Sequence, residues 1–177
     1  MNHDSYPDSY IRAILKSVKT VALVGASHKP ERPSWIVLKY LSERGYELFP
    51  INPGLAGREI LGLKVYASLI EVPAELDMVE IFRNSKAALP ITEEALALKP
   101  PPKVIWMQLS VRNDAAAEKA EQAGLTVVMN RCPKIEYGRL SGEISWQGVN
   151  SRILSAKQPV LAGKGFQKLT INRPGTG

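Results

Sequence analysis

Short apolar runs alternate along the chain with longer segments of helical character, and this alternation sets the predicted fold. Strands are expected at residues 20–24, 47–51, 77–82, 103–109 and 125–130. The first, fourth and fifth are almost continuously apolar, which is typical of strands covered on both faces. Alternating strands and helices imply parallel strands joined by right-handed crossovers. The pattern predicts an α/β fold: a doubly wound parallel sheet of about five strands, in the order 3-2-1-4-5, with helices on both faces. Its ligand is expected at the carboxyl ends of the strands.

Local signals mark where the intervening helices begin and end. The helix at 33–44 opens on Pro33, which suits a first turn, and stops before Gly45. A leading helix is expected at 8–17, within an N-terminal lead-in that spans residues 1–19. Two more helices are expected at 86–98 and in a segment that runs to residue 123. Their candidate N-caps are Asn84 or Ser85, and Asn113 or Asp114.

Composition narrows the class of protein. The chain has 177 residues, enough for one domain with a real core, and no apolar run approaches the roughly 20 residues of a membrane span. The N-terminus is polar and carries acids, so neither a signal nor a transit peptide is expected. The single cysteine, Cys132, excludes an internal disulfide and favours a cytoplasmic location. The periodic pattern fades towards the C-terminus, and 141–177 is expected to be a partly flexible extension.

The net charge of +6 makes nucleic acid one candidate partner. Part of the excess lies after Glu143, where the chain has several basic residues and no further acid. No basic run is interleaved with aromatic residues, and no helix-turn-helix pattern is present. Two histidines and one cysteine do not make a His/Cys zinc site on one chain. The sequence therefore favours a small-molecule ligand over nucleic acid, and leaves a homo-oligomer or a partner enzyme open.

The loop after the first strand has the features of a phosphate cradle. Gly25 lets the backbone turn tightly and approach a ligand, and Ala26 follows it. The N–H groups of this loop, together with the N-terminus of the helix at 33–44, can hold an anion. Turns in any parallel sheet also favour small residues, so the loop alone does not decide the ligand. Its polar and basic residues are Ser27, Lys29, Arg32 and Ser34.

The turn after the second strand, Asn52-Pro53-Gly54, narrows the choice of ligand. The glycine spacing of the dinucleotide fingerprint is absent, since Ser27 and Pro30 stand where further glycines would be. The second strand also ends without the acid that holds a free ribose 2′-hydroxyl. A carboxylate there would repel a ribose phosphate, so its absence favours a ligand that carries one. NADP and coenzyme A (CoA) both qualify.

Five blocks of sequence carry a resemblance to a known family. They read VALVGAS…KPERPSW, FPINPGLAGREILGLKVYASL, DMVEIFRNS, VIWMQL and VVMNRCPKIEY. In this order they resemble the small bacterial CoA-binding proteins of the CoA-binding-domain family, whose fold is similar to the N-terminal domain of the succinyl-CoA synthetase α subunit. The resemblance covers about residues 20–140. It implies a Rossmann-like domain that binds CoA through its 3′-phospho-ADP part.

The resemblance also implies roles for the residues of each block. The family's phosphate loop matches Gly25, Ala26 and Ser27, with Lys29, Arg32 and Ser34 beside it. The turn near the adenosine ribose and its 3′-phosphate matches Asn52, Pro53 and Gly54. The segment expected to border the adenine and phosphates matches Phe82, Arg83, Asn84 and Ser85. The turn beside the pantetheine arm matches Asn130, Arg131, Cys132 and Pro133.

One departure from the relatives limits the functional prediction. Succinyl-CoA synthetase α subunits have a second domain with a histidine that is phosphorylated during turnover. His3 and His28 lie in the wrong region for that role, so ligase activity is not expected. The leading hypothesis is non-catalytic binding of CoA or an acyl-CoA, in a carrier, sensor or subunit role. The alternative is an NADP-dependent oxidoreductase or a CoA-transfer subunit that requires a partner.

Three candidate residues have equally simple structural interpretations. Arg83 either faces the ligand or forms a surface ion pair with Asp77 or Glu80. Asn52 either contacts the ligand or closes an Asx-turn before Pro53. Cys132 is either a thiolate, stabilised by Arg131 and Lys134, that meets the CoA thiol, or a small buried residue in a tight turn.

Overall fold

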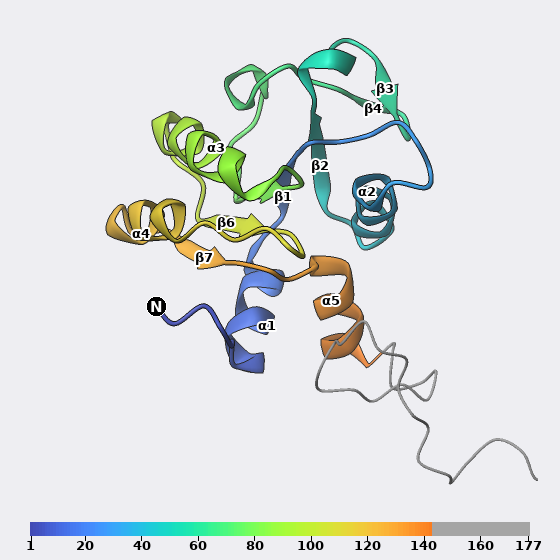
Figure 1. Ribbon diagram of the computed structural model, residues 1–177. Helices are drawn as coiled ribbons and strands as arrows, with labels where there is room; N and C mark the ends of the chain where they lie inside the picture. Colours follow the sequence, from blue (N-terminus) through green and yellow to red (C-terminus); the bar gives the residue numbers. More distant parts are fainter. Residues whose placement is uncertain (143–177) are drawn as a thin grey trace, which may run out of the picture.

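The structure of the protein is a computed structural model, and residues 1–142 are the part of the chain that it describes. The expected C-terminal extension at 141–177 therefore lies almost wholly outside the described residues. A parallel sheet forms the centre of the molecule, in the order β2-β1-β5-β6-β7 (Figure 1). The predicted doubly wound α/β fold is confirmed. The strands are β1 (Thr20–Val24), β2 (Glu47–Ile51), β5 (Met78–Ile81), β6 (Val104–Met107) and β7 (Thr126–Val128).

A short segment lies at the outer edge of β2. Ile51 forms an isolated parallel bridge with Tyr66, whose N–H donates to the Pro50 carbonyl over 3.0 Å. The bridge lies outside the five named strands, and β5, β6 and β7 continue the sheet beyond β1, in an order equivalent to the predicted 3-2-1-4-5 pattern. The strand predicted third, at 77–82, pairs instead with β1. A single bridge leaves no alternating apolar run, so the sequence pattern did not reveal it.

Helices cover both faces of the sheet, as predicted. Apolar side chains of α1 (Asp8–Ser17), α2 (Pro33–Glu43) and α5 (Pro133–Ser141) pack on one face. Those of α3 (Ser85–Ala97) and α4 (Asp114–Gln122) pack on the other. The sequence did not predict α5, because the residues it buries, Pro133, Glu136 and Gly138, do not form an apolar stripe. Small additions are the hairpin of β3 (Glu59–Ile60) and β4 (Leu63–Lys64) and the 3₁₀ turns η1 (Pro53–Leu55) and η2 (Leu69–Glu71).

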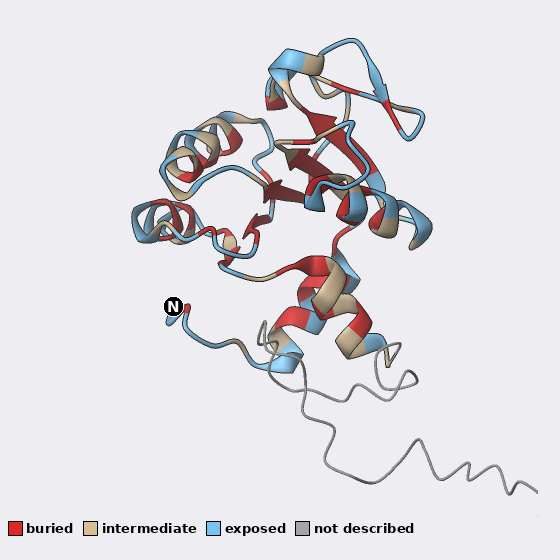
Figure 2. Cartoon of the chain, turned by 45° about the vertical axis from the view of Figure 1, so that its right-hand side comes forward, coloured by how far each residue is buried: buried red, intermediate tan, exposed pale blue. Residues whose placement is uncertain are grey.

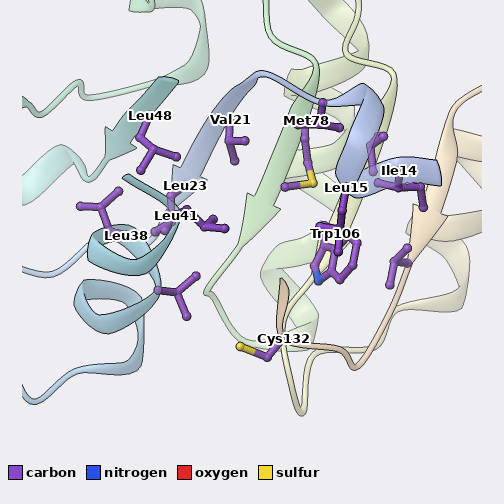
Figure 3. Close-up of a cluster of buried hydrophobic side chains, with 14 of the residues drawn as sticks. Ile14, Leu15, Val21, Leu23, Leu38, Leu41, Leu48, Met78, Trp106 and Cys132 are labelled. Atoms are coloured by element: carbon purple, nitrogen blue, oxygen red, sulfur yellow. The ribbon is translucent and has the colours of Figure 1, made fainter. Parts of the chain in front are cut away.

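The strands are buried on both faces, and alternate side chains supply two hydrophobic layers (Figure 2). Figure 3 shows the layer under α1 and α2, where Leu23, Met78 and Trp106 meet Leu15 and Leu38. Glu80 follows Met78 by two positions on β5 and therefore points into this same layer. It is fully buried, which is rare for a carboxylic acid.

The predicted helix caps on the second face are confirmed. The Asn84 side chain accepts from the Ala87 N–H at 3.0 Å, and the Asn113 side chain accepts from the Ala116 N–H at 2.9 Å. Each bond satisfies one backbone donor that a helix N-terminus leaves without a partner. Both caps lie at the carboxyl edge of the sheet, so they fix the loops that border this edge. Within residues 1–142, no helix has the length and apolar character needed to cross a membrane.

Candidate functional site

The strand order creates a crevice at the carboxyl ends of β1 and β5. The chain leaves β1 towards β2 on one side of the sheet, and β5 lies on the other side. In doubly wound folds, ligands bind where the order reverses in this way. The loops that follow β1, β2, β5 and β7 all lie at this edge, because the strands are parallel. The structure thus brings the segments that carry the predicted site residues to one edge of the sheet.

Gly25 lies in the turn after β1, in close contact with the segment after β5. Its φ is +96°, a conformation that side chains of L-residues rarely adopt. A Cβ atom at this position would lie 2.8 Å from the Phe82 carbonyl oxygen and 3.0 Å from the Arg83 Cδ. The turn after β1 therefore rests directly against the segment after β5. Only glycine fits this position without displacing backbone.

The backbone donors of this turn divide into two sets. The N–H groups of Gly25 and Ala26 both donate to the Ile51 carbonyl, over 2.9 and 3.2 Å, so they hold the turn itself. The N–H groups of Ser27 and His28 have no acceptor within residues 1–142. An anion at this loop would therefore meet the donors beyond Ala26 and the N-terminus of α2, rather than those of the glycine.

Other loop residues differ in their access to solvent. Lys29 and Arg32 are exposed and stand before α2, where their charges add to the field of the helix N-terminus. Ser34 is only 4% exposed, so its hydroxyl is withdrawn into the protein. The Ser27 hydroxyl accepts from the Lys29 N–H at 3.2 Å and shapes the loop locally.

Asn52 ties two turns of the site together. Its side-chain amide donates to the Ala26 carbonyl at 2.7 Å, and its Oδ1 accepts from the Gly54 N–H at 2.9 Å. The second bond is the Asx-turn expected from the sequence. Both polar ends of the side chain are thus engaged within the protein. Asn52 positions the loops after β1 and β2, and leaves Pro53 and Gly54 exposed beside them.

Arg83 does not form the surface ion pair considered from the sequence. The Asp77 carboxylate is 2.7 Å from Lys103 Nζ, and Glu80 is buried and accepts from Gln108 at 3.4 Å. Arg83 is exposed at the crevice and has no ion-pair partner within residues 1–142. Its guanidinium can therefore neutralise an anionic ligand without first breaking an ion pair to another described residue.

Hydrogen bonds join the loops after β5, β6 and β7 into one frame. The Asn130 side chain accepts from the Ser110 N–H at 2.8 Å, and the Asn113 side chain donates to the Ser85 carbonyl at 2.9 Å. The Ser85 hydroxyl accepts from the Arg112 N–H at 3.1 Å. Ser110 and Asn130 both have left-handed backbones, with φ of 66° and 54°. Such conformations persist where the surroundings fix them, and they are frequent at binding sites.

A cavity of about 520 Å³ opens within this frame. Phe82, Arg83, Asn84 and Cys132 line it, which are residues that the sequence singled out. Lys134 on α5, which the sequence placed beside Cys132, also lines it. The sequence missed the other walls, which are Pro33, Ile36 and Val37 on α2, Gln108 to Val111 after β6, and Ile135 on α5. The rule that ligands bind at the carboxyl ends of strands applies to β6 as well, and would have included its loop.

Cys132 is a buried residue whose thiol is kept neutral. Burial raises the pKa of the Cys132 thiol, in the opposite direction from the thiolate considered from the sequence. The two neighbouring cations point elsewhere. The Arg131 guanidinium lies 5.4 Å from the centre of the Tyr6 ring, and Lys134 Nζ lies 5.6 Å from the centre of the Tyr40 ring. The structure therefore favours the interpretation of Cys132 as a small buried residue at the start of α5.

Glu80 is a polar feature of the site that the sequence did not identify. Burial raises the pKa of Glu80 well above its usual range and so favours the protonated carboxyl. The Gln108 side chain donates to Glu80 Oε1, while Oε2 has no hydrogen-bond partner within the described residues. The sequence signal that could have indicated this buried acid was a glutamate within an otherwise apolar strand. No group of residues within 1–142 has an arrangement that could hold a metal ion.

Solved structures of similar proteins share this architecture. A hypothetical protein from Pyrococcus horikoshii has 42% sequence identity and a TM-score of 0.74, over 80% of this chain and 97% of that chain. A protein from Thermus thermophilus has 36% identity and a TM-score of 0.72, over 76% of this chain and 99% of that chain. In both cases the similarity extends over nearly the whole solved structure, so it covers a complete relative rather than a shared fragment.

Sequence comparisons identify the family. The uncharacterized protein YneT of Bacillus subtilis is 36% identical over 127 residues, which span 72% of this chain and 91% of YneT. The α subunit of ADP-forming acetate–CoA ligase I from Pyrococcus furiosus is 40% identical over 80 residues, or 43% of this chain and 17% of that subunit. A family model described as CoA binding domain matches residues 19–138. With the crevice and its loops, this match shows that the chain belongs to the CoA-binding domain family.

Proposed function

We propose that the protein binds CoA or an acyl-CoA without catalysing a reaction, and that it holds the ligand by its 3′-phospho-ADP part. The family supports a CoA-type ligand. In the proposed pose, the diphosphate lies over the Gly25 turn and the N-terminus of α2. The adenosine ribose and its 3′-phosphate lie towards Pro53 and Gly54, and the pantetheine arm leaves towards β6 and β7.

The observation that carries this proposal is the close approach of Gly25 to Phe82 and Arg83. This contact places the turn after β1, in which the N–H groups of Ser27 and His28 have no acceptor among residues 1–142, beside Arg83. The Arg83 guanidinium has no ion-pair partner among the same residues. Backbone donors, a helix N-terminus and an arginine are the groups that bind phosphates in proteins. Lys29 and Arg32 add positive charge on the side of the loop that faces solvent.

A binding role also agrees with the chemistry of the one cysteine. A thiol attacks a thioester only as the thiolate, and burial keeps Cys132 protonated. The ligase subunit from P. furiosus contains the similar segment as a minor part of a longer chain. We infer that the protein presents or stores its ligand, as a carrier, a sensor or a subunit that serves a separate enzyme.

The first experiment compares ligands by isothermal titration calorimetry. CoA should bind more tightly than 3′-dephospho-CoA, because each charge-assisted hydrogen bond to the phosphate contributes about 1.5–3 kcal/mol. NADP serves as the second ligand, since it also carries a ribose phosphate but has no pantetheine arm. Equal affinity for CoA and 3′-dephospho-CoA would remove the 3′-phosphate from the proposal. Tighter binding of NADP than of CoA would favour the oxidoreductase alternative.

The second experiment tests the placement of the guanidinium. Arg83→Ala should weaken CoA binding and leave the unfolding free energy within about 0.5 kcal/mol of the wild type, because the side chain is exposed. Arg12→Ala is the matched control. Arg12 is also exposed, but it lies on α1, where it donates to the Leu140 carbonyl at 3.2 Å. If both variants bind CoA like the wild type, Arg83 does not contact the ligand.

A further inference from the structure

The cavity beyond β5, β6 and β7 has apolar walls that the rest of residues 1–142 leaves partly exposed. Ile36 on α2 is 41% exposed, and Leu109 in the loop after β6 is 45% exposed. Both line this one cavity, with Phe82, Val111 and Ile135. Large apolar side chains that stay exposed around a hollow are typical of a surface that an apolar ligand covers.

Two polar side chains of the cavity, Asn84 and Gln108, form hydrogen bonds within the protein itself. The Asn84 Oδ1 accepts from the Ala87 N–H, and the Gln108 Oε1 accepts from the Leu109 N–H at 2.8 Å. The Gln108 amide also donates to the buried Glu80. The pantetheine arm contains two amides, and an amide buried without a partner is destabilising. An alkyl group needs no such partner, so it suits the apolar part of the cavity, at Leu109, Val111 and Ile135, better than the arm does.

In the proposed pose, the thiol end of CoA points towards this cavity. Phe82 and Arg83 stand against the Gly25 turn and also form the near wall of the cavity. From there the cavity extends past Leu109 to Ile135 on α5, away from the turn at Asn52. A ligand whose diphosphate lies at Gly25 and whose ribose lies near Asn52 has its thiol end on this side of the site.

We propose that this cavity holds the acyl group of an acyl-CoA, so that the protein selects aliphatic acyl-CoA over free CoA. The inference rests on the proposed function, because the same loops must hold the CoA part. In this arrangement the pantetheine amides stay near the open rim, where water satisfies them, and the alkyl chain occupies the interior. Cys132 lies in the wall as a neutral thiol and adds to the apolar surface.

The test measures affinities of the full-length protein for CoA, acetyl-CoA, butyryl-CoA and hexanoyl-CoA by calorimetry. Each methylene that enters the cavity should tighten binding about fourfold, which corresponds to about 0.8 kcal/mol. The gain should stop once the cavity is full. Equal dissociation constants for CoA and hexanoyl-CoA would overturn the inference and leave the proposed function intact. If no member of the series binds, both the proposed function and the inference fail.

Variants of cavity residues test whether the increase in affinity with acyl chain length arises in this cavity. Ile36→Gln and Leu109→Gln should remove most of the increase from acetyl-CoA to hexanoyl-CoA and leave the affinity for free CoA unchanged. Ile70→Gln is the control, because Ile70 is 78% exposed and lies on η2, outside this cavity. Thermal unfolding verifies that all three variants are folded. A chain-length gain that persists in both cavity variants would show that the acyl group lies elsewhere.

Discussion

Substitution of Gly25 by alanine tests the central geometric feature of the site. Two effects of the Gly25→Ala substitution each lower the free energy of unfolding, and they add. The left-handed backbone of an alanine costs about 1–2 kcal/mol. The new Cβ would also lie 2.8 Å from the Phe82 carbonyl oxygen and 3.0 Å from the Arg83 Cδ. The Arg83 side chain can move, but the Phe82 carbonyl is backbone and must be pushed aside, at about 1–3 kcal/mol. The expected loss of stability is therefore about 2–5 kcal/mol.

Gly124→Ala separates the two costs. Gly124 also has a positive φ, +85°, but no atom lies within 4 Å of its added Cβ. It should lose only the backbone part, about 1–2 kcal/mol. Urea unfolding of the two variants and the wild type gives the free energies, and calorimetry with CoA gives the affinities. Gly25→Ala should also bind CoA more weakly, while Gly124→Ala binds normally. Equal losses of stability in the two variants would refute the argument that close packing against Phe82 requires glycine.

Three further predictions concern buried or capping side chains. Burial raises the pKa of Glu80 in the folded protein above its value in the unfolded chain. Stability should therefore fall as pH rises above about 4.5, by up to about 1.4 kcal/mol per pH unit. Glu80→Gln should remove this dependence of the unfolding free energy on pH, measured by urea unfolding at pH 5 and pH 8. If the variant keeps the same dependence, the raised pKa of Glu80 is not its cause. Asn84→Ala should lower the free energy of unfolding by about 0.5–2 kcal/mol, because α3 loses its N-cap hydrogen bond. A smaller loss of stability would show that water replaces the Asn84 side chain as the acceptor for the Ala87 N–H. Cys132 should react slowly with iodoacetamide in the folded protein and quickly in urea, and rapid labelling of the folded state would show an accessible thiolate.

The sequence determined the elements whose information is local. The apolar runs at 20–24 and 47–51 form strands with the predicted bounds, and the helix predicted at 8–17 also has the observed bounds. Asn84 and Asn113 were each one of two predicted caps, because a cap needs only a side-chain oxygen and the next turn of backbone, and the structure selected them over Ser85 and Asp114. The doubly wound fold also followed from the sequence, since the alternation of strands and helices permits few topologies.

Features with weak local signals escaped prediction. The helix α5 buries a proline, a glutamate and a glycine, so no apolar period marks it. The bridge at Tyr66 involves one residue on each strand, and only its partner in β2 makes it part of the sheet. Local sequence patterns do not show which distant segments pair with one another. The pairing of the strand at 77–82 with β1 is therefore seen only in the tertiary structure.

The chemical state of the site residues was decided by their neighbours in space. Sequence placed Arg83, Asn52 and Cys132 at the carboxyl edge, but it left each with two interpretations. Packing left Arg83 without an ion-pair partner within residues 1–142, engaged both polar ends of Asn52, and buried Cys132 so that its pKa rises. Desolvation and hydrogen bonding depend on every group packed around a side chain, most of which are distant in sequence. The sequence therefore determined which segments meet at the carboxyl edge of the sheet, and the tertiary structure decided what each of these side chains is free to do.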